Sequence, residues 1–240
     1  GYNVAVGYVA GTAMTTGTLN TLVGGLSGDA LTIGNSNVAI GHQALTTEVA
    51  GDRSVAIGLN ALRYQTNAST TDVYNVAVGY EAGTNVTTGT YNILIGGEAG
   101  DAVTTGTHNV AIGYQALSSE DAHGKNVAVG NYALQDLNAG ADGGNTALGY
   151  VAGAELTTGI RNTIVGSWAG DALTTGSHNI AIGSFALSAE DGHGKNIAIG
   201  YNALEDLNAG ADGYNIAVGY DAGKNISTGI NNTVVGGIAG

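Results

Sequence analysis

The sequence contains no cysteine and no proline, and its 240 residues include one tryptophan, one phenylalanine and one methionine. The absence of cysteine excludes disulfide bonds and thiolate chemistry, so packing and hydrogen bonds must supply the stability. Charged residues make up only 10% of the chain, with six Lys and Arg against nineteen Asp and Glu. The net charge of -13 repels phosphate groups, which argues against nucleic acid or an anionic membrane as a partner.

Long apolar runs are also absent. No apolar stretch approaches the roughly 20 residues that a membrane-spanning helix needs, so we expect no membrane insertion. The first residues lack the basic segment and apolar stretch of a signal peptide. Glycine is abundant at 42 residues, but without a Gly-X-Y period and with an ordinary hydrophobic fraction, which argues against both collagen and disorder.

A five-residue pattern of the form Asn-x-Ala-x-Gly, with other residues at its first or third position in some copies, recurs fourteen times along the chain, first at residues 3–7. Successive copies start 17 residues apart in most cases and 19 or 21 residues apart in the others. This interval is too short for a βαβ unit and is typical of one coil of a solenoid. We therefore predict an all-β fold, a parallel β-solenoid (β-roll) of about fourteen 17- to 21-residue coils, with residues 1–240 forming a single continuous rod.

Positions within a coil are numbered here from its asparagine. Positions 2 and 4 are Val, Ile, Thr or Leu, which predicts a short strand, and position 5 is always Gly, which predicts a corner. In about half of the coils an apolar position 12 precedes Thr-Thr-Gly or a close variant, which predicts a second short strand. The coils form groups of four that start near residues 3, 75, 145 and 215, and insertions in the fourth coils are expected to bulge from one face.

The asparagines at position 1 are predicted to form a structural ladder, because stacked coils place equivalent residues about 4.8 Å apart. Its members are Asn3, Asn20, Asn37, Asn75, Asn92, Asn109, Asn126, Asn145, Asn162, Asn179, Asn196, Asn215 and Asn232, with Ser54 as the one interruption. A catalytic or glycosylated role is the alternative. The row is too regular for a site, and the glycosylation pattern occurs only at scattered places such as Asn85.

Position 3 predicts an oligomer. It is Ala in ten coils and a larger apolar residue in the rest (Leu22, Leu94, Ile164 and Val234), so the strands are apolar on both faces. Strands of this kind are covered on both faces, which requires a partner in addition to the interior of the coil. We interpret position 3 as the side that faces the partner, with the larger residues forming bumps roughly 19 Å apart that fix the register between chains.

The pattern resembles two sets of fibrous proteins. Asn-Val-Ala-Ile-Gly and Ser54-Val55-Ala56-Ile57-Gly58 resemble the head repeat of trimeric autotransporter adhesins. The longer unit, Gly-Tyr-Asn-x-Ala-x-Gly-Tyr-x-Ala-Gly followed by Thr-Thr-Gly-x-x-Asn-Thr, is similar to repeats of phage and bacterial tail-fibre-like proteins, and this likeness spans the entire chain. The chain departs from the adhesin head in its longer coils, and no chaperone or membrane-anchor domain lies within the 240 residues.

The resemblance implies a left-handed solenoid wound as a homotrimer that is extracellular, on a cell surface or on a virion. The function we expect is that of a structural fibre or shaft segment that spaces or presents a binding tip. The chain starts just before a strand and stops within a coil, so we expect a segment of a longer fibre or a unit that stacks end to end. The alternative is an adhesin whose own surface binds host glycans or receptors.

Five aromatic residues are candidates for recognition under that alternative: Trp168, Tyr8, Tyr80, Tyr150 and Tyr220. The four tyrosines recur at position 6 of the first coil of each group, which predicts a line of rings along the rod. Such rings stack on sugars, but they also pack at chain interfaces with the hydroxyl in water.

Calcium is the one cofactor that the sequence raises. Two fourth-coil loops place oxygen ligands at alternate positions around a glycine, at Asp136, Asn138 and Asp142 and at Asp206, Asn208 and Asp212. A bidentate Glu at the twelfth position is missing, and the same residues are common in exposed turns, which is the alternative interpretation. No other cofactor is expected.

Other activities have less support. His123 and His193 lie beside acidic residues, but without a concave site we do not expect catalysis, and we expect Glu120 and Glu190 to pair with Lys125 and Lys195. The Thr-Thr pairs suggest ice binding as a third function. These pairs are missing from third coils and most fourth coils, so the array is interrupted.

Overall fold

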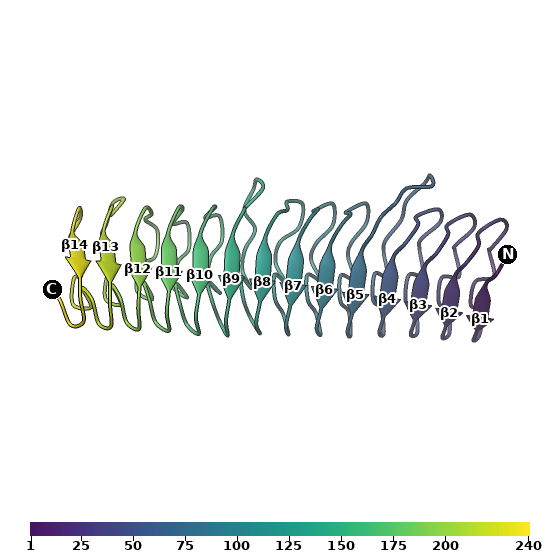
Figure 1. Ribbon diagram of the computed structural model, residues 1–240. Helices are drawn as coiled ribbons and strands as arrows, with labels where there is room; N and C mark the ends of the chain where they lie inside the picture. The colour runs from purple at the N-terminus through teal and green to yellow at the C-terminus, as the bar shows by residue number, and fades with distance from the viewer. The chain divides into compact units, whose positions relative to one another are not determined.

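The computed structural model describes residues 1–240 and contains strands but no helix. It consists of two compact units, Gly1–His123 and Gly124–Gly240, and each unit is a parallel β-solenoid of seven strands (Figure 1). The first unit contains β1 (Val4–Val6), β2 (Thr21–Val23), β3 (Val38–Ile40), β4 (Val55–Ile57), β5 (Val76–Val78), β6 (Ile93–Ile95) and β7 (Val110–Ile112). The second contains β8 (Val127–Val129), β9 (Thr146–Leu148), β10 (Thr163–Val165), β11 (Ile180–Ile182), β12 (Ile197–Ile199), β13 (Ile216–Val218) and β14 (Thr233–Val235).

The predicted all-β fold of parallel coils of about 17 residues is confirmed. Each strand covers positions 2 to 4, and neighbouring strands of a unit pair in register, with Ala77 opposite Leu94 as an example. The backbone amide of Val76 donates to the carbonyl of Asn92 at 2.8 Å, which links one coil to the next. The expectation that residues 1–240 form one continuous rod concerns how the two units are joined, and it stays a prediction.

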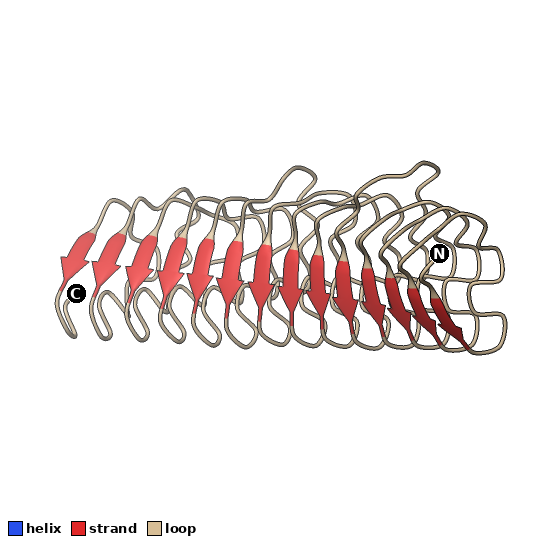
Figure 2. Ribbon diagram, turned by 45° about the vertical axis from the view of Figure 1, so that its right-hand side comes forward, coloured by secondary structure: helices blue, strands red, loops and turns tan.

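We predicted a second short strand at position 12 and the Thr-Thr-Gly segment, and this prediction is wrong. In the first coil the amides of three consecutive residues, Thr15 to Gly17, all donate to the carbonyl of Thr32, at 2.9, 3.3 and 3.2 Å. A carbonyl that receives three consecutive amides lies at a turn, whereas a strand ladder alternates between donors and acceptors. Each coil therefore has one strand, and the rest of it is turns and extended loop (Figure 2).

The glycine at position 5 is required by the corner that ends each strand. Gly79 has a φ of +144°, and a Cβ on it would lie 2.3 Å from the carbonyl oxygen of Gly96 in the next coil. Both the backbone conformation and the close approach of the next coil exclude any side chain. The same relationship recurs between Gly24 and Gly41 in the first unit and between Gly149 and Gly166 in the second.

The interpretation of position 3 as the partner-facing side is wrong, because position 3 lines the interior of each coil. Ala39, Ala77, Leu94 and Ile164 are all fully buried within the chain. Their neighbours at positions 2 and 4 are partly exposed, so the strand presents its β-branched residues outward. The larger position-3 residues therefore fill the core and form no bumps on the outside.

The core explains why these larger residues occur in second coils. A Cβ on Gly83 would lie 2.6 Å from one methyl of Leu94, and a Cβ on Gly100 would lie 2.6 Å from the other. Glycine at position 9 of the first and second coils thus provides the space that Leu94 fills. In third and fourth coils position 9 is a buried leucine, as at Leu117 and Leu134, and position 3 returns to alanine.

Position 7 holds a non-glycine residue with positive φ in every coil. Examples are Val9 at +61°, Glu98 at +56° and Trp168 at +60°. This conformation costs an L-residue on the order of 1 kcal/mol. The amides of Glu98 and Trp168 form hydrogen bonds that offset this cost, since Glu98 donates to the carbonyl of Tyr80 at 2.8 Å and Trp168 donates to that of Tyr150 at 3.0 Å.

The insertions of the fourth coils form the longer loops between β4 and β5 and between β8 and β9 in Figure 1. A parallel bridge joins Asp72 of the first of these loops to Asp52, which lies between β3 and β4. No helix that could span a membrane is present.

Candidate interaction surface

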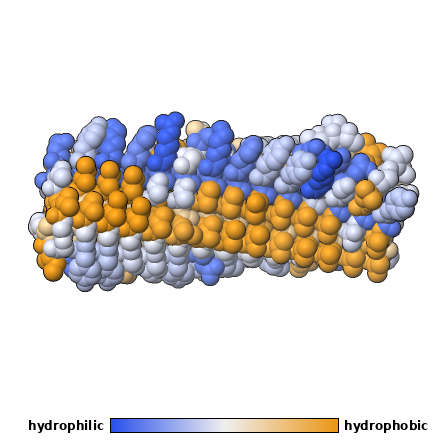
Figure 3. All heavy atoms as spheres, viewed as in Figure 1, coloured by the Kyte–Doolittle hydropathy of each residue, from blue (hydrophilic) through white to orange (hydrophobic).

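The outward face of the strands is apolar in both units. Positions 2 and 4 of all fourteen coils are Val, Ile, Thr or Leu, and none is charged. In the first unit Ile40 and Ile93 are 37% and 39% exposed, and in the second Leu148 and Ile216 are 48% and 37% exposed. Figure 3 shows these apolar atoms gathered over the strands, with hydrophilic residues on the flanking turns. Contiguous exposed apolar surface of this kind marks an interaction site.

Two of the five candidate recognition residues lie in the first unit. Tyr8 and Tyr80 lie in the first unit, in coils followed by a glycine at the same position, Gly25 or Gly97. The hydrogen bond from the Tyr80 hydroxyl to Glu81 raises the pKa of that phenol. All the predicted aromatic residues are exposed, with Tyr8 at 80%.

The second unit brings two of the five candidates together. Tyr150 and Trp168 meet edge to face with ring centroids 5.5 Å apart, and Tyr132 meets Tyr150 in the same way at 6.1 Å. Trp168 reaches this place because position 7 of one coil lies beside position 6 of the coil before it. Tyr220 instead stacks on Tyr201 at 5.4 Å. The aromatic surface is therefore built between adjacent coils, and the four-coil period predicted only some of its members.

A separate aromatic stack in the first unit was not predicted. Tyr74, Tyr91 and His108 each directly precede the asparagine of a coil, and they stack with centroid distances of 5.6 and 5.0 Å. Arg53 lies over the Tyr74 ring at 5.6 Å, so a cation extends the stack. The signal that could have found it is the 17-residue spacing of these three residues, which places them in adjacent coils.

The asparagines at position 1 link successive coils within each unit through side chain and backbone. The Oδ1 atom of Asn145 accepts the backbone amide of Asn162 at 2.9 Å, and the Oδ1 atom of Asn162 accepts that of Asn179 at 2.8 Å. The Nδ2 atom of Asn162 donates to the carbonyl of Gly176, 14 residues later, at 2.8 Å. In most coils the asparagine side chain thus fixes both the stacking of its coil and the return of the chain to the next strand.

Ser54 interrupts this row, and a glutamine bridges the interruption. Gln65 donates from Nε2 to the Ser54 hydroxyl at 3.0 Å, and its Oε1 accepts from Asn75 Nδ2 at 2.9 Å. Gln65 is fully buried at position 12, which is apolar in most coils. The shorter serine and the longer glutamine are therefore complementary changes at one place in the stack.

The two loops with the predicted calcium ligands each tie one of their carboxylates to a lysine. Asp142 pairs with Lys125, and Asp212 pairs with Lys195 at 2.5 Å. The hydrogen bond to Asp212, followed by one to Tyr214, raises the pKa of Lys195, and Lys195 in turn lowers the pKa of Asp212. The expected pairing of these lysines with Glu120 and Glu190 is wrong, because both glutamates are buried beside a histidine. Calcium binding at Asp136, Asn138, Asp206 and Asn208, which are exposed, stays a prediction.

Asp101, at position 10 of a second coil, is the carboxyl group with the largest perturbation. Burial raises its pKa to about 6 from the usual 3.8, hydrogen bonds from backbone amides oppose this rise, and the nearby Glu98 and Glu81 add to it. Its Oδ1 atom is buried without a hydrogen-bond partner. The group is therefore a source of pH dependence on this flank of the first unit.

Thr87, Thr104, Thr157 and Thr174 of the Thr-Thr pairs donate from Oγ1 to a carbonyl of the next coil, at distances between 2.8 and 3.1 Å. These hydroxyls serve the stacking of coils. The structure contains no pocket. The outward strand face and the aromatic clusters are exposed surfaces suited to binding. No protein-family model matches the chain, and it has no significant similarity to any curated protein or solved structure.

Proposed function

We propose that this chain is a structural segment of a trimeric fibre, in which the outward strand faces of three copies pack together. The observation that carries the proposal is the uncharged face formed by positions 2 and 4 in both units. Interface cores between proteins are depleted of charged residues and enriched in apolar ones, as this face is. A monomer would leave the face in water along every coil.

The interior of each coil supports a structural role. The core is complete within one chain, with alanine or a larger residue at position 3 and leucine or glycine at position 9. Within each unit, every coil is also tied to the next by backbone hydrogen bonds from its strand and, in most coils, by its asparagine. Repeats that are linked only to their neighbours give an extended element that bears a binding tip at a distance.

The family resemblance supports an extracellular, cell-surface or virion location, a left-handed winding and end-to-end stacking of segments. Sedimentation equilibrium or light scattering at micromolar concentration tests the assembly. We expect a mass three times the 23.7 kDa of the chain. A monomer mass at that concentration would overturn the proposal, since the apolar face would then be stable in water.

A second candidate function is recognition by the flank of the fibre, and the cluster of Tyr132, Tyr150 and Trp168 favours it. The Tyr150 ring lies 6.1 Å from that of Tyr132 and 5.5 Å from that of Trp168, and exposed aromatic surface of this kind is one on which sugar rings stack. The ligand under this candidate is a cell-surface glycan or receptor. It is compatible with the first, because the cluster lies on the turn that follows the strand.

A further inference from the structure

Each third coil holds a buried glutamate at a place where most coils hold an apolar residue. Glu48, Glu120 and Glu190 occupy position 12, and each is fully buried. The equivalent residue is Leu31, Val103 or Leu173 in second coils. A buried carboxylate is costly unless its charge is compensated or its oxygens are hydrogen-bonded.

Glu48 is satisfied entirely by neutral donors. Its Oε1 atom accepts the backbone amides of residues 49, 50, 51 and 67 at 2.7 to 3.0 Å. Its Oε2 atom accepts from Gln65 Nε2 at 2.8 Å and from Asn67 Nδ2 at 2.9 Å. Six hydrogen bonds account for both oxygens, so this glutamate has a structural role.

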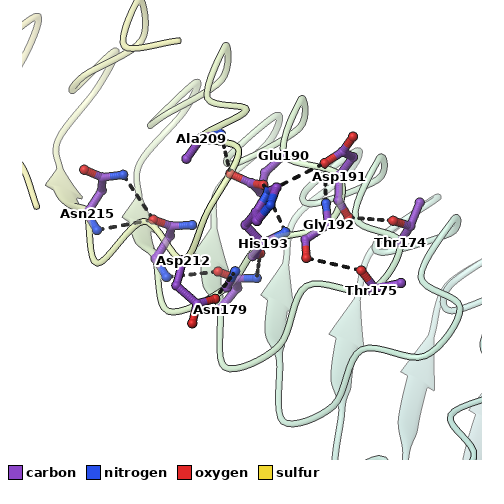
Figure 4. A network of polar contacts seen from close by, with 12 residues as sticks. Thr174, Thr175, Asn179, Glu190, Asp191, Gly192, His193, Ala209, Asp212 and Asn215 are labelled. Atoms are coloured by element: carbon purple, nitrogen blue, oxygen red, sulfur yellow. Dashed lines mark hydrogen bonds and ion pairs between the residues drawn. The ribbon is translucent and has the colours of Figure 1, made fainter. Parts of the chain in front are cut away.

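Glu190 has different surroundings (Figure 4). The residues equivalent to Gln65 and Asn67 are Leu207 and Ala209, so both side-chain donors are replaced by apolar groups. Glu190 Oε2 receives only the backbone amide of Ala209, at 3.3 Å, and Oε1 receives the amide of His193 at 3.1 Å. The His193 ring faces the same carboxylate, with Nδ1 3.1 Å from Oε1, and the Asp191 carboxylate lies 3.9 Å from Nδ1 on the other side.

The same arrangement occurs in the first unit at Glu120, Asp121 and His123. Nδ1 of His123 lies 3.4 Å from Glu120 Oε1, and this nitrogen is buried without a hydrogen-bond partner. A buried ring nitrogen that faces a buried carboxylate and has no hydrogen bond is suited to a shared cation. In each cluster one ligand atom from each of the three residues lies within 4.8 Å of the others.

We infer that Glu120, Asp121 and His123 bind one divalent transition-metal cation of the zinc type, and that Glu190, Asp191 and His193 bind a second. The donor set is one imidazole nitrogen and two carboxylates, which suits zinc and its neighbours, whereas calcium takes oxygen ligands alone. In the second unit Lys195, two residues after His193, is paired with Asp212, and the ion-pair partner of Glu190 is the His193 ring.

The clusters are accessible to an ion. The side chains of His193 and Asp191 are 29% and 55% exposed, while Glu190 is buried beneath them. The ion would therefore sit between a fixed inner carboxylate and two outer ligands that can close over it. Zinc sites of this kind complete four-coordination with water. The inference is independent of the trimer, because all three ligands of each site come from one loop.

The test is calorimetric titration of the chelator-treated full chain with Zn²⁺, followed by Co²⁺ as a spectroscopic probe. We expect two ions per chain and the visible absorption bands of tetrahedral Co²⁺. Replacing one histidine, His123→Ala or His193→Ala, should leave one ion, and the double variant should lose at least tenfold in affinity at both sites. His178→Ala is the matched control, because His178 is an exposed histidine beside Arg161 and belongs to neither cluster.

A measurement on the wild-type protein tests the inference independently of any folding defect in the variants. Zn²⁺ should shift the imidazole NMR signals of His123 and His193 and leave those of His42, His108 and His178 in place. The inference is overturned if Zn²⁺ does not bind, or if the double variant binds two ions as tightly as the wild type. It is also overturned if Ca²⁺ displaces Zn²⁺ at equal concentration, because the imidazole would then not be a ligand.

Discussion

Leu94 and Gly83 are complementary across two coils, with one methyl of Leu94 lying 2.6 Å from the place where a Cβ of Gly83 would be. Leu94 is fully buried and takes the place that a leucine at position 9 fills in third and fourth coils. The same interior volume is thus filled either by a large residue at position 3 or by a leucine at position 9. Position 3 is large in second coils, and position 9 is leucine in third and fourth coils.

This packing predicts the effect of truncating Leu94. Leu94→Ala leaves a cavity beside Gly83 and Gly100, both of which lack side chains to fill it. We expect a loss of about 2 to 5 kcal/mol in the free energy of unfolding. Chemical denaturation monitored by circular dichroism measures it, with the outward-facing Thr163→Ala as the control. A loss equal to that of the control would mean that position 3 does not support the core.

The strand face predicts how assembly responds to charge. A pair of changes on that face, Ile40→Asp and Ile182→Asp, should give a folded monomer, because each carboxylate would be buried without a partner between chains. Asn138→Asp, in an exposed loop, adds charge without touching the face and should leave the mass unchanged. Sedimentation velocity distinguishes the two, and a double variant that still sediments as the trimer would place these strands in water.

Ala181→Asp is expected to behave differently from Ile182→Asp, although the residues are adjacent. Ala181 is fully buried inside its coil, so a carboxylate there should unfold the coil and not only separate the chains. Far-ultraviolet circular dichroism should lose its strand signal for Ala181→Asp and keep it for Ile182→Asp. The reverse result would restore the interpretation that position 3 faces outward.

The sequence predicted the fold because the alternation of positions 2 to 4 and the glycine at position 5 both follow from local backbone geometry. It could not predict which face of the strand is inside, because both faces are apolar and a period of two is symmetric with respect to them. The deciding information is the pairing of Leu94 with Gly83 and Gly100, which involves residues in different coils. The surroundings of Glu190 could not be predicted for the same reason, because they include Leu207 and Ala209 of the next coil.

The asparagine row predicts a large loss of stability from a single substitution. Asn162→Ala removes the acceptor of the Asn179 amide and the donor to the Gly176 carbonyl, and both backbone groups lie in the buried stack. Each buried group left without a partner costs about 1 to 3 kcal/mol. We expect a marked fall in the melting temperature, with the exposed Asn138→Ala as the control. Equal melting of the two variants would remove the structural role of the row.

Asp101 predicts a pH dependence of stability. Its pKa of about 6 in the folded chain is above the usual 3.8, so the folded state holds a proton that the unfolded state releases between these values. The stabilisation is complete below pH of about 4 and is lost as the pH rises through about 6. Asp101→Asn should therefore melt at a higher temperature than the wild type near pH 7.5 and at a similar temperature near pH 4. A difference that does not change with pH would contradict the raised pKa.

The last prediction concerns Trp168, the only tryptophan of the chain, whose ring meets Tyr150 edge to face. If the flank binds glycans or receptors, a ligand that stacks on this cluster should change the intrinsic fluorescence of Trp168, because no other indole contributes to the signal. Trp168→Ala and Tyr150→Ala should each weaken attachment to host cells or immobilised glycans by tenfold or more, since an exposed aromatic ring supplies much of such a contact. Tyr91→Ala is the matched control, because it removes a stacked ring from the first unit and leaves this cluster intact. If attachment survives in Trp168→Ala and Tyr150→Ala as it does in Tyr91→Ala, the cluster has no role in recognition.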